Sequence, residues 1–107
     1  MENPYMYIFV RNDLSHPQQI VQASHSAYEM GKLAPVGCRP NVVLIGVSNE
    51  EELLSVEELL MRNDIPYHQF YEPDISGFTS ISTAPVTGVE RSVFKKFSTM
   101  RAAHLSK

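Results

Sequence analysis

Strand-like and helix-like segments alternate along this chain, and that alternation limits the possible folds more than any other feature. Four short runs rich in β-branched and aromatic residues predict strands at 5–10, 42–47, 67–71 and 78–83. Three segments with apolar residues at helical spacing predict helices at 15–31 (caps included), 49–62 and 88–100. Strands separated by helices imply crossover connections, so we predict a single three-layer α/β domain. Its four-stranded mixed sheet should be mostly parallel, with helices on both faces.

Local patterns refine this prediction. Capping boxes mark three helix starts: Ser15 with Gln18, Ser48 with Glu51, and Thr87 with Glu90. A continuous apolar run at 42–47 predicts a central strand covered on both faces. The segment 32–40, with two prolines and a glycine, predicts a loop after a helix that Gly31 would cap.

Helical spacing also predicts which side chains face the core. On the first helix these are Ile20, Val21, Ala23, Ser24, Ala27 and Tyr28. On the second they are Leu53, Val56, Leu59 and Leu60, with the glutamates outward, and on the third Val89, Val93, Phe94, Phe97 and Met100.

Composition excludes several classes of protein. A length of 107 residues with 43% hydrophobic residues suits one domain with a real core, spanning 1–107. No apolar run approaches the roughly 20 residues of a membrane helix, and the N-terminus has no basic region typical of a signal peptide. We therefore expect a cytoplasmic protein. The single Cys38 excludes an internal disulfide, the histidines lack metal-ligand spacing, and no glycine-rich phosphate loop is present.

The charge is distributed unevenly. A net charge of −3 argues against a generally basic nucleic-acid binder. From Arg91 onward, however, the chain carries five cations and no acid. Arg91 and Lys95 are therefore candidate contacts to an RNA backbone. The alternative is a solvated helix face whose cations favour the C-terminal end of the helix dipole.

A polar stripe runs along the first predicted helix. Gln18, Gln22, His25 and Glu29 stand at i, i+4, i+7 and i+11, which places them on one side. This stripe predicts either hydrogen-bonding groups lining a cleft or a solvated face with one packed histidine.

Two loops should lie beyond the carboxyl ends of the predicted strands, where open α/β sheets bind ligands. Arg11 and Asp13 follow the first strand and could bind a substrate phosphate or form an ion pair with each other. Asp74 follows the third strand, where a carboxylate could orient or deprotonate a water. An aspartate near a glycine is also ordinary turn chemistry.

The order of these motifs resembles the type-2 peptidyl-tRNA hydrolase family. The matching segments are VRNDL at 10–14, QASHSA at 22–27, VLI at 43–45, SNEEEL at 48–53 and DISGFT at 74–79. The resemblance covers almost the whole chain and implies a four-stranded α/β domain without a metal or organic cofactor. It implies hydrolysis of the ester that joins a peptide to the 3′ end of tRNA, so tRNA is the expected partner.

The resemblance also implies site residues. Asp74 stands for the site aspartate, Thr79 for the first site threonine and Thr83 for a later one. Arg11, Asp13, Gln22 and His25 would position the substrate. The segment from Asp74 to Gly77 is one residue longer than in the family.

Gln18 stands where the family has a lysine, and an amide cannot supply a cation to a developing oxyanion. The alternative is therefore a binding module that kept the fold, lost the chemistry, and holds RNA or a protein through the same face. A homodimer is also compatible with a small sheet that has apolar edges.

Overall fold

The sheet is built around β1 (Tyr5–Arg11), a strand whose five central residues are all buried. In the computed structural model, which describes residues 3–97, β1 lies between β2 (Asn41–Val47) and β4 (Gly77–Thr83). β3 (Tyr67–Glu72) pairs with β4 and completes the order β2-β1-β4-β3.

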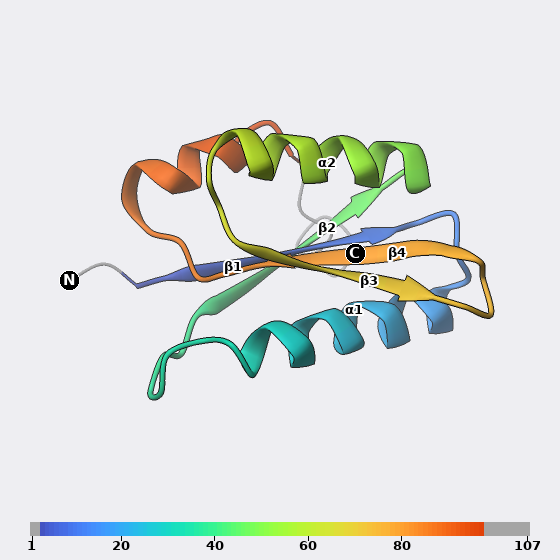
Figure 1. Ribbon diagram of the computed structural model, residues 1–107, viewed down its shortest axis with the longest axis horizontal. Helices are drawn as coiled ribbons and strands as arrows, with labels where there is room; N and C mark the ends of the chain where they lie inside the picture. Colours follow the sequence, from blue (N-terminus) through green and yellow to red (C-terminus); the bar gives the residue numbers. More distant parts are fainter. Residues whose placement is uncertain (1–2, 98–107) are drawn as a thin grey trace, which may run out of the picture.

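Helices cover both faces of this sheet (Figure 1). α1 (His16–Gly31) packs on one face, while α2 (Glu50–Arg62) and the 3₁₀ helix η1 (Gly88–Phe94) pack on the other. The predicted three-layer α/β arrangement with a mixed sheet is confirmed.

The pairing is less parallel than the sequence predicts. Among the strands that the structure describes, only β1 and β2 pair in parallel, while β1–β4 and β3–β4 are antiparallel. The physical reason is the short turn between β3 and β4, which forces a hairpin, because a parallel connection needs a long crossover. These pairings still make β1, β2 and β3 run in one direction, so their carboxyl ends meet at one edge of the sheet.

The prediction that residues 42–47 form a central strand is wrong. β2 is an edge strand, and Val42 is 57% exposed. The hairpin strand β4 takes the other side of β1, so β1 and β4 are the central pair.

The larger apolar core lies between the sheet and α2. It contains Tyr7, Phe9, Ile45, Val47, Leu53, Val56, Leu60, Ile65, Ile81, Val86 and Phe94. Leu53, Val56 and Leu60 of α2 face this core as predicted, whereas Leu59 is only half-buried and lies outside it. The helix cap also differs from the prediction by one residue. Asn49 caps the helix by accepting from the Glu52 backbone N–H at 2.9 Å, and Glu52 in turn accepts from the Ser48 backbone N–H.

The predicted inward face of α1 is wrong for its larger residues, although Ala23 and Ala27 do pack against the smaller apolar cluster of Met6, Ile8 and Met30 as predicted. Gln19, Gln22, Ser26 and Met30 are buried, whereas Ile20 and Tyr28 are 68% and 67% exposed and Val21 is exposed as well. The reason is hydrogen bonding to β4: the hydroxyls of Ser80 and Ser82 donate to the backbone carbonyls of Gln22 and Ser26 at 2.9 and 2.7 Å. We call these two bonds the α1–β4 polar contact. They rotate the polar side of the helix toward the sheet.

The remaining helix ends follow the predictions only in part. Ser15 caps α1 as predicted, and α1 ends at Gly31, but the residue that caps it is Lys32. Thr87 makes no side-chain cap, η1 ends at Phe94, and Val89 is exposed rather than inward. Val93, Phe94 and Phe97 do pack against the core as predicted, while Met100 lies outside the described residues.

A hydrogen bond between α2 and β3 gives the fold a titratable contact. The Tyr67 hydroxyl donates to a Glu57 carboxylate oxygen at 2.6 Å, and this bond is the main cause that raises the pKa of Tyr67 to about 12. A group whose pKa is raised on folding stabilises the folded state at pH values below its pKa in the unfolded chain. This stabilisation is lost as the pH rises through the pKa in the folded protein.

We therefore expect the stability difference between the wild-type protein and Tyr67→Phe to shrink between about pH 10 and about pH 12. The free energy of unfolding, measured by urea titration at each pH, checks this. Tyr71→Phe is the matched control, because Tyr71 is exposed on the same strand, and it should change the free energy of unfolding by less than about 0.5 kcal/mol. A Tyr67→Phe difference that stays constant to pH 12 would contradict the expectation.

Candidate functional site

The edge of the sheet where β1, β2 and β3 end brings together the two loops singled out in the sequence. Arg11 at the end of β1 donates from Nη1 to the backbone carbonyl of Phe78 in β4 at 3.2 Å. Two groups of side chains lie at this edge, one on each face of the sheet.

The first group, the Arg11–Glu50 cluster, consists of Arg11, Asp13, Glu50 and Phe78. Arg11 donates from Nε and Nη2 to the two carboxylate oxygens of Asp13 at 3.0 and 2.9 Å. The Phe78 backbone N–H donates to Glu50 Oε2 at 2.9 Å. Both polar backbone groups of Phe78 are thereby bonded, which fixes the start of β4 against β1 and α2.

The charged groups of this cluster are paired with each other, and the space beside them is tightly filled. The hydrogen bonds between Arg11 and Asp13 lower the pKa of the Asp13 carboxyl and raise the pKa of Arg11. Gly77 lies directly beneath, where a Cβ atom would come within 3.1 Å of Glu50 Oε2 and 3.3 Å of Arg11 Nη1. Of the two roles that the sequence leaves open for Arg11 and Asp13, the internal ion pair is the one present.

The second group, the amide network, consists of Gln18, Gln22, Glu72 and Thr79 on the α1 side of the sheet. The Thr79 hydroxyl donates to Gln22 Oε1 at 2.6 Å. Gln22 Nε2 donates to Gln18 Oε1 and to Glu72 Oε1, both at 3.3 Å. Glu72 Oε2 accepts from the backbone N–H of Asp74 at 3.3 Å, so the network reaches the turn after β3.

These bonds determine how each amide is turned. Thr79 and Gln22 are fully buried, and the Thr79 donor makes Oε1 the acceptor end of Gln22. Gln22 therefore presents its N–H groups to Gln18, whose carbonyl oxygen is engaged in turn. The amide nitrogen of exposed Gln18 remains as the donor at the surface end of this row of hydrogen bonds.

A β-bulge explains why Thr79 faces α1. Phe70 pairs with Ser80 and Tyr71 with Phe78, which leaves Thr79 as the extra residue on β4. Strict alternation would place Thr79 on the opposite side from Ser80. The bulge puts both hydroxyls on the α1 side, where each bonds to Gln22.

Asp74 lies in the exposed turn between β3 and β4. Within residues 3–97 its carboxylate forms no ion pair, so no cation of that part of the chain is bonded to it. The turn closes through the Ser76 backbone N–H, which donates to the Glu72 carbonyl at 2.9 Å. Ser76 has φ 58, in the left-handed region, just before Gly77 begins β4.

The other candidates from the sequence lie apart from the amide network. His25 is exposed on α1 and stacks on the Phe70 ring, with centroids 4.8 Å apart and planes at 4°. Thr83 is fully buried at the opposite end of β4, where its hydroxyl accepts from the Tyr7 backbone N–H at 3.0 Å.

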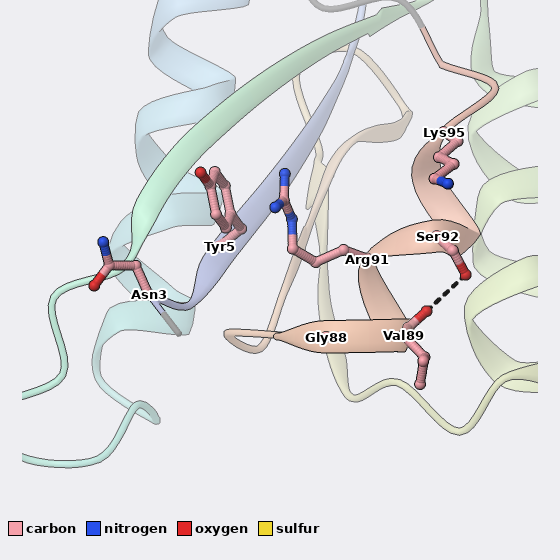
Figure 2. A pocket seen from close by; sticks show the side chains of 7 residues that line it. All are labelled: Asn3, Tyr5, Gly88, Val89, Arg91, Ser92 and Lys95. Carbon is pink, nitrogen blue, oxygen red and sulfur yellow. Dashed lines mark hydrogen bonds between the residues drawn. The ribbon is translucent and has the colours of Figure 1, made fainter. Parts of the chain in front are cut away.

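Arg91 lies in η1 and Lys95 caps its C-terminal end, near the amino end of β1. The Arg91 guanidinium carbon lies 3.5 Å from the centroid of the Tyr5 ring, and Figure 2 shows these two side chains against each other. β1 runs from Tyr5 to Arg11, so the region around Arg91 is about 20 Å along the strand from the edge that holds Asp74.

Sequence reasoning missed two glutamates that hold these groups together. Alternation on β3 could have placed Glu72 on the same side as Phe70, facing the polar stripe of α1. Glu50 was expected to point outward with its neighbours in α2. Its bond to Phe78 depends on the sheet order, which local patterns do not reveal.

The described part of the chain contains neither a cluster of metal ligands nor a membrane-spanning helix. Among residues 3–97, no three His, Cys, Asp or Glu side chains gather as they would to hold a metal ion. None of the helices there combines the length and apolar character needed to cross a membrane.

Comparisons with known proteins support the fold. No family model and no curated protein matches the sequence. Among solved structures, a protein of unknown function from Agrobacterium tumefaciens strain C58 is similar, with a TM-score of 0.68 and 10% sequence identity. The similarity covers 92% of this chain and 98% of the other, so the two proteins share the α/β fold across nearly their full lengths.

The amide network should depend on the Thr79 hydroxyl. Thr79→Val keeps the shape but leaves buried Gln22 Oε1 without this donor, so we expect a loss of about 1–3 kcal/mol in unfolding free energy. Chemical denaturation measures this. Thr87→Val is the matched control, because Thr87 is exposed and makes no cap, and it should change stability by less than about 0.5 kcal/mol. Equal effects of the two variants would argue against the network.

Proposed function

We propose that this chain is a peptidyl-tRNA hydrolase-like esterase that acts on the ester between a peptide and the 3′ end of tRNA. The observation that supports this proposal most is the amide network. It links Gln18, Gln22 and Thr79 directly, and Asp74 through Glu72, although α1 lies far in the sequence from the hairpin of β3 and β4. These are residues that the family resemblance implies for the site. We also propose a cytoplasmic location, where such a substrate is made.

The proposed reaction is general-base hydrolysis. Asp74 takes a proton from a water whose oxygen attacks the ester carbonyl carbon. The bond from that carbon to the ribose oxygen then breaks, and the ribose oxygen receives a proton. The products are a peptide with a free carboxyl group and a tRNA with a free 3′ end.

In this proposal the side-chain amides of Gln18 and Gln22 orient the substrate carbonyl group, where the family uses a lysine. Thr79 is fully buried, so we assign it a positioning role: it turns Gln22, and Gln22 turns Gln18. The N–H groups of exposed Gln18 then donate to the substrate carbonyl oxygen. A neutral donor stabilises a developing oxyanion less than a cation does, so we expect a slow enzyme.

The second candidate is a binding module that no longer cleaves. The observation that favours it is the Asp74 carboxylate, which no cation within residues 3–97 pairs with. In this case Arg91 and Lys95 contact the RNA backbone, and affinity falls steeply with salt.

Single-turnover hydrolysis of N-acetyl-aminoacyl-tRNA separates the two candidates. We expect cleavage by the wild-type protein and a loss of about 100-fold or more in Asp74→Asn. Asp64→Asn is the matched control: Asp64 is exposed beyond the end of α2, and asparagine also tolerates its φ of 55, so its rate should be unchanged.

Two results would change the assignment. Absent cleavage by the wild-type protein, with tRNA binding retained, would favour the binding module. Equal cleavage by the wild-type protein and Asp74→Asn would remove Asp74 from the catalytic role.

A second experiment tests the amides. Gln18→Ala should lower the single-turnover rate by up to about 100-fold, while Gln18→Lys should match or exceed the wild-type rate by supplying a cation. Thr79→Ser should keep the rate because its hydroxyl still turns Gln22. A Gln18→Ala rate equal to wild type would show that this amide does not contact the reacting carbonyl.

A further inference from the structure

A cleft lies on the opposite face and end of the sheet from the amide network, between η1 and strands β1 and β2. It joins two pockets of about 730 and 470 Å³, which share Tyr5, Arg91 and Lys95. We call this the η1 cleft. Figure 2 shows the outer pocket, where Arg91 lies against Tyr5 and Lys95 follows along η1.

The two parts of the cleft differ in chemistry. The outer pocket is lined by the two cations, by the small or polar residues Asn3, Gly88 and Ser92, and by Tyr5 and Val89. The inner pocket is lined by the aromatic residues Tyr7, Phe94 and Phe97 and by Val42, Val43 and Leu44 of the edge strand β2. Of these three β2 residues, Val43 packs on the α2 side of the sheet, whereas Leu44 packs on the α1 side. No acidic residue is among the described residues that line either pocket.

The cationic end is held in place by the core. Arg91 donates from Nε to the Tyr7 hydroxyl at 3.1 Å, while its guanidinium stacks on Tyr5. Tyr7 is buried and stacks on Phe94, with ring centroids 4.0 Å apart and planes at 17°. Arg91 therefore needs little reordering on binding, which reduces the entropic cost of holding a ligand.

We propose that the η1 cleft binds a small anionic amphiphile, a molecule with one carboxylate or phosphate group and an apolar tail. The head group lies between Arg91 and Lys95, and the tail lies along Val43, Phe94 and Phe97. A cationic mouth beside an apolar interior is complementary to this class of ligand and to neither an uncharged hydrocarbon nor a bare anion. This goes beyond the proposed hydrolysis, because it uses none of the catalytic residues.

Three probes separate the contributions of head and tail. Octanoate carries both, 1-octanol has only the tail, and inorganic phosphate has only a charged head. Binding to the full chain is followed by amide chemical-shift changes in NMR spectra. We expect octanoate, and octyl phosphate in a parallel titration, to bind at least tenfold more tightly than either partial probe. The shifts should centre on Tyr5, Val43 and Lys95.

Two neighbouring lysines provide a matched pair of variants. Lys95 lines the cleft, whereas Lys96 lines neither of its pockets. Both are exposed, so charge reversal should leave the fold intact, as thermal unfolding checks. Lys95→Glu should weaken octanoate binding at least tenfold, and Lys96→Glu should change it less than twofold.

Three outcomes would overturn the proposal. Equal effects of Lys95→Glu and Lys96→Glu would indicate attraction to overall charge. If octanol bound as tightly as octanoate, the cleft would be an apolar groove without a role for the cations. If octanoate did not bind, the cleft would not be a site for this class of ligand. If Lys95→Glu weakened tRNA binding while octanoate did not bind, the RNA contact of the proposed function would stand without this site.

Discussion

The rotation of α1 about its own axis depends on the α1–β4 polar contact, and much of the molecule follows from that rotation. Two serine hydroxyls on β4 donate to backbone carbonyls of α1, whose N–H partners lie within the helix. Side chains as small as serine let the helix backbone approach the sheet closely. The helix consequently buries glutamines and a serine, while several of its larger apolar residues face outward. Hydrogen bonding has prevailed over apolar burial on this face, and the main apolar core lies on the other.

The two faces of the sheet therefore contribute differently to the protein. The α2 side provides most of the apolar burial, and with it most of the expected stability. The α1 side contains a buried polar network in which each amide is oriented by its neighbour, beginning at Thr79. Such networks are specific because an unsatisfied buried group is costly, so the arrangement tolerates few alternatives.

The sequence predicted the layers of the fold well and their details less well. The strand runs, the Ser15 cap and the burial of Leu53, Val56 and Leu60 on α2 follow local rules, and all three are as predicted. The central position predicted for residues 42–47 failed because sheet order depends on where the hairpin inserts. The face of α1 failed because apolar periodicity carries no information about hydroxyls elsewhere in the chain. Among the candidate site residues, Gln18, Gln22 and Thr79 do come together, whereas Thr83 is buried at the far end of its strand.

The bulge at Thr79 has a consequence for reading other chains with this fold. It changes the phase of β4, so that residues before it and after it obey alternations offset by one position. A spacing counted across the hairpin therefore does not identify which face a side chain occupies unless the bulge is counted too. Loss or gain of one residue there would exchange a buried hydroxyl for an apolar group without altering the strand order. Such a hairpin allows the polar lining of one face to vary while the apolar core behind the other stays unchanged.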